Sequence, residues 1–295
     1  MKHLWDSLQQ QVSQMKLRLR ASVRRRLALD ILAVSTGIRS VVLLDYLPYN
    51  PPFLRQFCDL LQHLSQEVIE MVLLRVLNME GCAYLVHPLY MLDFMEQSLN
   101  ASCQIMFVSL DEDLPKRVCQ AEHEIVVKHL CVVKNQLSSL LLAHSNFNTE
   151  EPSRHKEAED KLPMLEAGSI LSSSDILLPT LNGWLLGYPV VYIFKRERAS
   201  HAGRCLAAGT LHLYQVLVSS ILPGTIKPEG NAEMLLDEDE LLSFSVPSEL
   251  SPLASFEPWA KVFFVELSKS VQRACHVWMS VRLEVSSRKM DVVAL

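Results

Sequence analysis

The chain has 295 residues, of which 49% are hydrophobic and 21% charged, and its net charge is −5. This composition is typical of a folded globular protein and argues against overall disorder, and the length allows one large domain or two small ones. Neither a general affinity for nucleic acid nor a glycine-rich phosphate loop is expected, because the net charge is acidic and only nine glycines are present.

Seven cysteines are scattered along the chain, mostly inside apolar patterns and without a C-x-x-C pair. A free cysteine in such a position behaves as a small buried hydrophobe. No signal peptide is recognised, and no uninterrupted apolar run approaches the roughly 18 residues of a membrane span. We therefore expect a soluble, reduced, intracellular protein in the cytoplasm or nucleus, without a transmembrane segment.

The first predicted element is a long amphipathic helix. Apolar residues recur at spacings of three and four from Trp5 to Val34, and Gly37 is placed to end the helix in a left-handed conformation. Basic residues crowd the stretch from Lys2 to Arg26, against the single acid Asp6. We interpret residues 1–23 as a basic amphipathic extension that packs on the fold with a solvated face. The alternatives are a membrane surface, a transit peptide or, favoured among these three, a helix that binds a protein partner.

Three short apolar runs follow, and each ends abruptly in polar residues. The first, over 41–44, leads into Asp45 and Tyr46; the second, over 83–86, leads into His87; the third, over 105–108, leads into Ser109 and the acids 111–113. A helical pattern comes after each run, the first of them capped by Asn50. This alternation predicts β-α units of a mostly parallel sheet, in which ligands bind beyond the carboxyl ends of the strands.

The second half of the chain predicts a different arrangement. Polar loops are expected at 145–165 and 223–240, strands at 188–194, 211–219 and 241–246, and a last helix from Trp259. Alternation over 277–285, a turn over 286–289 and the apolar end 292–295 predict an antiparallel hairpin. The predicted fold is thus one α/β domain over residues 24–295, with a single mixed sheet that is parallel in its first half, flanked by helices, and a C-terminal antiparallel hairpin.

The residues that follow the first three strands are the candidate ligand-binding residues: Asp45, Tyr46, His87 and Asp111. If the strands are parallel neighbours, carboxylates and an imidazole converge there and could perform acid-base chemistry or hold a cation. The favoured alternative gives each residue a local role. Asp45 would cap a turn, His87 would precede a proline-started helix, and the acids 111–113 would favour the next helix N-terminus.

Signatures of known enzymes are missing from the chain. It contains no dinucleotide-binding glycine motif, no P-loop and no nucleophile elbow. His123-Glu124 begins like a zinc-binding H-E-x-x-H motif, but Val127 stands where the second histidine must be. No metal site and no cofactor are expected.

Three stretches together resemble an uncharacterised animal protein family, a UPF family built on one domain of unknown function. They are residues 29–34 with Gly37-Ile38-Arg39 and Leu43-Leu44-Asp45-Tyr46, residues 183–192, and the end 292–295. The resemblance covers roughly residue 24 to the end and implies a single intracellular domain, but no activity, substrate or cofactor. The favoured hypothesis is a non-catalytic interaction or scaffold protein with a partner at the N-terminal helix. The alternative is a small-ligand-binding protein or a hydrolase-like enzyme that uses the strand-end cleft, so catalysis stays open.

Overall fold

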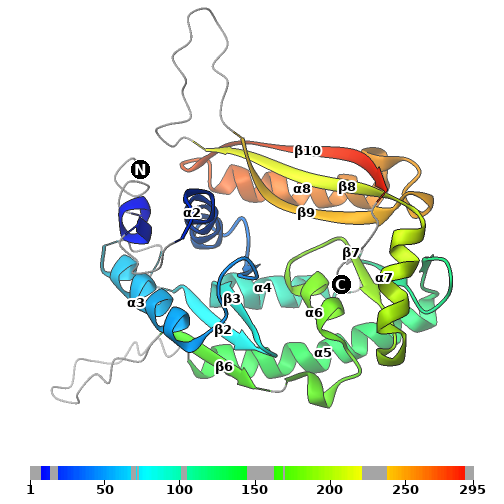
Figure 1. Cartoon of the computed structure of the whole chain (residues 1–295), viewed down its shortest axis with the longest axis horizontal. Coiled ribbons are helices and arrows are strands. Elements are labelled where there is room, and N and C mark those ends of the chain that lie inside the picture. Colours follow the sequence, from blue (N-terminus) through cyan, green and yellow to red (C-terminus); the bar gives the residue numbers. More distant parts are fainter. Residues whose placement is uncertain are drawn as a thin grey trace, which may run out of the picture.

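A computed structural model gives the fold and describes residues 8–13, 19–67, 71, 73–100, 105–144, 163–168, 170–220 and 238–289 (Figure 1). Most of the loop expected at 145–165 lies outside these residues, but its end belongs to strand β6 (Met164–Gly168). Likewise, the end of the loop expected at 223–240 begins strand β9 (Glu238–Pro247). The last residues of both predicted loops are therefore strand residues.

The α/β class is confirmed, but the described strands form three sheets where one was expected. The first sheet has the order β1-β3-β2-β6, with β1 (Val41–Leu43), β2 (Arg75–Met79) and β3 (Cys82–Val86). The second has the order β5-β4-β7, with β4 (Met106–Ser109), β5 (Lys116–Arg117) and β7 (Val190–Ile193). The third, β10-β8-β9, contains β8 (Thr210–Ser220) and β10 (Trp278–Lys289).

The first sheet is buried on both faces. Val76 and Leu85 belong to a core shared with helices α2 (Ala21–Ser35) and α3 (Pro51–Glu67). Their neighbours along the strands, Leu77 and Tyr84, face the opposite way, into a second core. That core is shared with three further helices: α4 (Pro88–Ser98), α5 (Gln120–Ala143) and α6 (Leu178–Leu185). Because successive strand residues point to opposite faces, these two helical layers explain why neighbouring residues of β2 and β3 are both apolar and buried.

The parallel order expected in the first half of the chain is wrong. β1 and β3 are antiparallel, with Val41 opposite Val86. β2 and β3 form a hairpin whose turn residues, Glu80 and Gly81, have φ of 51° and 76°, as a type I′ turn requires. The parallel pairs join β2 to β6 and β4 to β7. β2 was missed because its apolar residues continue the helical spacing of α3.

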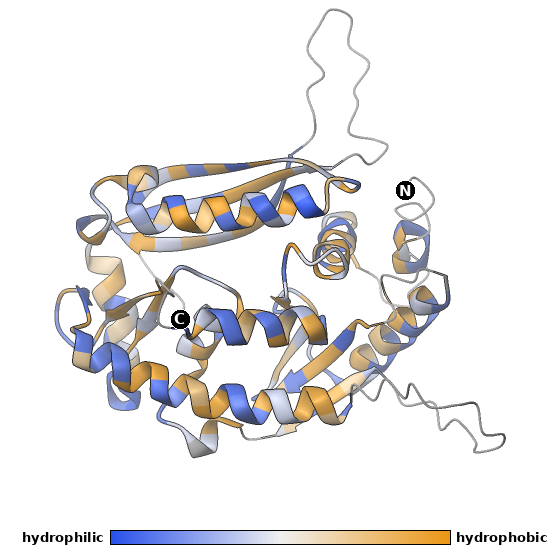
Figure 2. Cartoon of the chain, turned by 180° about the vertical axis from the view of Figure 1, so that it is seen from behind, coloured by the Kyte–Doolittle hydropathy of each residue, from blue (hydrophilic) through white to orange (hydrophobic). Residues whose placement is uncertain are grey.

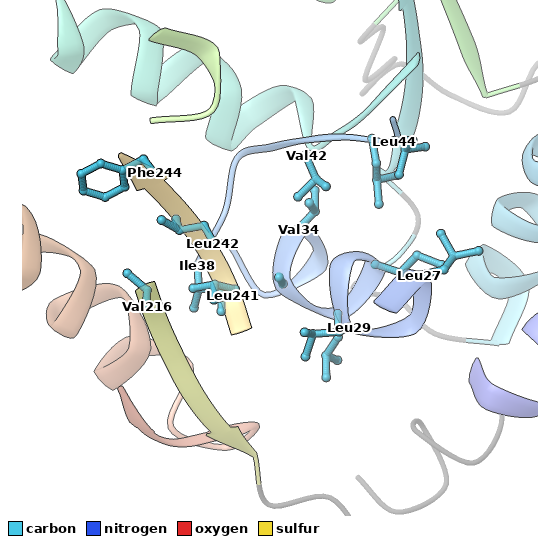
Figure 3. Close-up of a cluster of buried hydrophobic side chains, with 14 of the residues drawn as sticks. Leu27, Leu29, Val34, Ile38, Val42, Leu44, Val216, Leu241, Leu242 and Phe244 are labelled. Carbon is cyan, nitrogen blue, oxygen red and sulfur yellow. The ribbon is translucent and has the colours of Figure 1, made fainter. Parts of the chain in front are cut away.

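The apolar face of the predicted N-terminal helix packs against the chain's own core. α2 is buried from Leu27 to Ser35, and Gly37 has a φ of +73°, as predicted. Figure 3 shows residues of α2 packed beside β9 and β8 of the third sheet. Leu8 and Val12 are 0% and 1% exposed, so part of the expected extension lies in the core. A protein partner at this helix stays a prediction. Because the apolar face is buried in the chain's own core, such a partner would have to bind the basic face.

Arginines of α2 bind the third sheet. Arg25 makes two hydrogen bonds to the Asp239 carboxylate, both of 2.9 Å. Arg26 donates to the backbone oxygen of Glu240 at 2.6 Å. The basic face of this helix is thus partly committed to β9 and is not wholly solvated.

The C-terminal strands are antiparallel, as expected, but their pairing differs. β10 pairs along its length with β8, and residues 286–289 continue the strand instead of forming a turn. Helix α8 (Pro258–Arg273) covers the sheet with its aromatic rings. The ring centroids of Trp259 and Tyr214 are 5.1 Å apart, and those of Phe263 and Phe244 are 5.6 Å apart. Residues 292–295, the second arm of the expected hairpin, lie outside the described residues.

Helix α5 is the longest in the part of the chain that the structure describes, and by length and composition alone it could cross a membrane (Figure 2). One stripe of the helix is buried in the second core: Val126, Leu130, Val133, Leu137 and Leu141. Ile125 of the same helix is 53% exposed and lies outside this buried stripe.

Candidate ligand-binding site

The predicted site residues do not meet at one edge of a sheet. The amide of His87 bonds to the Ser40 oxygen at the start of β1, whereas Asp45 follows the other end of that strand. Four residues lie between Ser40 and Asp45, and at about 3.3 Å per residue the two points are about 15 Å apart. Asp111 follows β4, which belongs to a different sheet. The premise of a shared strand edge is wrong, because β1 and β3 are antiparallel; a ligand role for each residue alone stays a prediction.

Tyr46 belongs to a buried ionic network, while Asp45 is exposed in the turn beside it. The Tyr46 hydroxyl donates to Oδ2 of Asp30 at 2.6 Å, and Nε of Arg26 donates to the same oxygen at 3.0 Å. Asp30 is 1% exposed, and burial raises the pKa of its carboxyl against the opposing effect of Arg26. The network joins α2, the loop after β1 and, through Arg26, β9, which is a structural role.

His87 has the local role considered as the alternative. It is the N-cap of α4, its Nδ1 accepts from the Tyr90 amide at 3.4 Å, and its ring stacks on Tyr90 with centroids 4.0 Å apart. Burial, with a smaller contribution from the nearby Arg75 guanidinium, lowers the pKa of His87 to about 4. The imidazole is therefore neutral near pH 7 and is engaged by its own helix.

Asp111 alone reaches an edge where parallel strands end. Its Oδ1 accepts from the amide of Lys195 at 2.8 Å, which ties the residues after β4 to those after the adjacent strand β7. Helix α7 (Ala199–Ala208) covers the acidic loop after β4: Nε2 of His201 lies 2.9 Å from the Glu112 backbone oxygen. Hydrogen bonds thus fix this edge.

A pocket of about 550 Å³ opens beside that edge. The chain segments that follow β2, β6 and β7 contribute to it through Glu80, Leu171 and Arg196, respectively. The remaining lining residues come from these segments, from the start of α6 and from α7: Ser172, Ile176, Leu177, Leu178, Pro179, Phe194, Ala199 and Gly203. Three strands that take part in parallel pairing therefore converge on one mostly apolar cavity, the location at which α/β proteins bind ligands.

Glu80 is the unusual residue of this pocket. It is the first of the two central residues of the type I′ turn, with a φ of 51°, where asparagine, aspartate or glycine is preferred. Its Oε1 accepts from the Leu171 amide at 3.3 Å, which connects the hairpin to the 3₁₀-helix η2 (Ile170–Ser173). A non-glycine residue in this conformation costs on the order of 1 kcal/mol, and such strain is concentrated at functional sites.

The pocket lining contains charged side chains but few that are suited to catalysis. It contains one carboxylate and one guanidinium and neither histidine nor cysteine. Among the described residues, no group of three or more histidine, cysteine, aspartate or glutamate side chains is arranged to hold a metal ion. The arrangement suits the binding of a polar-headed organic molecule better than acid-base or nucleophilic catalysis.

Sequence reasoning missed Glu80 and Arg196, although a signal for each exists. Arg196 comes two residues after the predicted strand 188–194, so the strand-end rule applied there would have found it. The Glu80-Gly81 pair between two apolar runs is a hairpin signal that the helical interpretation of residues 53–76 concealed.

Comparison with known proteins assigns the chain to a family. The model of one protein family, described as a domain of unknown function (DUF4504), matches residues 9–295. The match begins ahead of residue 24, where the resemblance was expected to begin, and so includes the buried Val12. No solved structure matches the chain.

Proposed function

Since the chain belongs to DUF4504, a family defined by a domain of unknown function, we propose a function from its own geometry: non-catalytic binding of a small amphipathic anion. The observation that carries the proposal is the cavity of about 550 Å³ where the segments after β2, β6 and β7 converge. Its volume lies within the range of about 300–1,000 Å³ that is usual for small-molecule sites.

The chemistry of the ligand follows from the lining. Leucine, isoleucine, proline and phenylalanine side chains form most of the wall and favour an apolar body. Arg196 provides a planar donor for a carboxylate or phosphate oxygen. Glu80 on the facing hairpin accepts a hydrogen bond from a ligand hydroxyl or amine, in addition to the Leu171 amide.

A thermal-shift screen of the full chain against carboxylate and phosphate metabolites tests the proposal. A ligand that binds only the folded state raises the melting temperature by mass action. The shift should be lost in Arg196→Gln, which removes the charge, and in Gly203→Leu, which fills the cavity. It should persist in Arg204→Gln, which changes an exposed arginine of α7 outside the lining. Equal shifts in all four proteins would place the ligand elsewhere and contradict the proposal.

As part of this proposal, we place the protein in a reducing compartment, the cytoplasm or nucleus. The six cysteines that the structure describes are free thiols, which supports this location. Mass spectrometry after alkylation of the unreduced, unfolded protein should find seven modified cysteines, the number in the sequence. A stable disulfide in the protein isolated from cells would contradict the location.

A further inference from the structure

The outer strand of the third sheet has an edge without a partner strand in the part of the chain that the structure describes. The order β10-β8-β9 leaves β10 bonded to β8 on one side only. Figure 1 shows this strand along the outer margin of the molecule, with β9 on the inner side of the sheet. β10 is 12 residues long and pairs regularly with β8 from Ser280 to Lys289. A long regular edge is a template for another strand.

The two faces of β10 differ in character. Val281, Leu283 and Val285 are half-buried on the face that meets α8, and Arg282 and Glu284 are exposed on the other face. Arg282 contacts both Glu284 of its own strand and Glu238 of β9. A guanidinium carries five donors, so Arg282 can also bind a carboxylate from a further strand.

We propose that β10 pairs antiparallel with β10 of a second copy of this chain, on a two-fold axis through Leu283. In this register, Arg282 of each copy lies opposite Glu284 of the other, which makes two opposite-charge pairs. On the α8 face, Val281 lies opposite Val285 in both halves and Leu283 lies opposite itself. The result is one continuous six-stranded sheet with an isologous interface.

The charges select this register and a partner of the same sequence. Moving the axis by one residue toward the start of β10 puts Arg282 opposite Arg282, and moving it one residue the other way puts Glu284 opposite Glu284. Like charges directly opposite each other are destabilising in a sheet. A strand from another protein must carry the same charges in the same order to pair as well. Charge complementarity therefore favours a second copy of the chain over an unrelated strand.

Sedimentation velocity on the full chain measures the association. The wild type should sediment as a species of twice the 33.5 kDa of one chain. Arg282→Glu and Glu284→Arg should each be monomeric, because each places like charges opposite one another. Arg55→Glu, the same change of charge on the exposed face of α3, should remain dimeric. A monomeric wild type, or a dimer that survives both reversals, would overturn the proposal.

Mixing the two charge-reversed variants separates the pairing from a general loss of stability. Arg282→Glu carries acids at both positions 282 and 284, and Glu284→Arg carries bases at both, so a heterodimer has both cross-strand pairs restored. An equimolar mixture should regain the dimer, whereas each variant alone stays monomeric with a cooperative thermal transition. Failure to form the heterodimer would rule out the register. In the wild type, hydrogen exchange of residues 279–289 should slow with rising protein concentration, and exchange independent of concentration would contradict the interface.

Discussion

Tyr46, from the loop after β1, donates a hydrogen bond to the buried carboxylate of Asp30 in helix α2. The phenol donates across 2.6 Å to the oxygen that Arg26 also binds, while Oδ1 of Asp30 is buried without a hydrogen-bond partner. The predicted site residue Tyr46 thus stabilises a charge that the fold has placed in a poorly hydrated position. The loss of the hydroxyl should show how much this contact stabilises the fold.

Tyr46→Phe should lower the free energy of unfolding by about 1.5–3 kcal/mol, because it removes a hydrogen bond to a charged, buried group. Urea unfolding followed by circular dichroism measures this loss. Tyr49→Phe is the matched control: its hydroxyl donates to Asn78 at the same 2.6 Å, but to a neutral amide at an exposed position. Equal losses in the two variants would show that Asp30 is not the reason.

His87 should make stability depend on pH below neutrality. Its pKa is about 4 in the folded chain, against about 6.5 in an unfolded one. As the pH falls below 6.5, the unfolded state takes up a proton that the folded state does not, so stability decreases until the pH reaches about 4. The full loss is about 3 kcal/mol at the conversion of 1.36 kcal/mol per pKa unit.

His87→Asn should remove this part of the pH dependence and keep the helix cap, since asparagine is among the best N-cap residues. Urea unfolding at pH 7 and pH 4.5 gives the comparison. His63, exposed on α3, is the control histidine, and His63→Asn should leave the wild-type pH profile unchanged. A profile that stays as steep in His87→Asn as in the wild type would assign the effect to other groups.

Glu80→Asn should leave stability unchanged or raise it by up to about 0.5 kcal/mol while weakening binding in the pocket. Asparagine tolerates the positive φ of a type I′ turn better than glutamate, which offsets the long hydrogen bond to Leu171. Thermal unfolding with and without a ligand found in the screen measures both effects. A clear loss of stability with unchanged binding would assign Glu80 a structural role only.

Gly37→Ala should cost about 1 kcal/mol more than Gly81→Ala. Both glycines have a φ above +70°, so both substitutions bear the strain of the left-handed region, about 1–2 kcal/mol. At Gly37 an added Cβ would also lie 2.7 Å from the Tyr90 ring, whereas nothing lies within 4 Å of one at Gly81. Urea unfolding of the two variants gives the difference, and the excess should shrink in a Tyr90→Ala background. Equal costs would mean that the ring moves freely.

Local signals in the sequence predicted local structure well. Asn50 caps α3 by accepting from the Phe53 amide at 2.9 Å, Pro88 begins α4, and Gly37 follows the end of α2. In each case a short segment determines its own backbone, because the cap, the ring or the missing Cβ acts on its immediate neighbours.

Pairing between distant strands was not predictable in the same way. The carboxyl end of β4 was found, but its neighbour in the sheet is β7 and not β1 or β3. Strand order depends on which helices cover each face, and several orders satisfy the same apolar pattern. The rule that sites form at strand ends led to Asp111, and the pocket lies beside that residue. The charged residues of the pocket, Glu80 and Arg196, follow strands β2 and β7. The apolar pattern of the sequence did not predict how these two strands pair.

The two parallel pairs also determine when the molecule can fold. Val76 pairs with Met164 and Met106 with Val190, so both inner sheets wait for residues from the second half of the chain. Contacts so distant in sequence slow folding, because a long loop must close before either strand gains its parallel partner. On the ribosome, where residues are added at about 5–20 per second, β2 and β4 wait several seconds for these parallel partners, although β3 and β5 can already pair with their other edges. The nascent chain therefore exposes one open edge on each of these two strands until the second half of the chain is made.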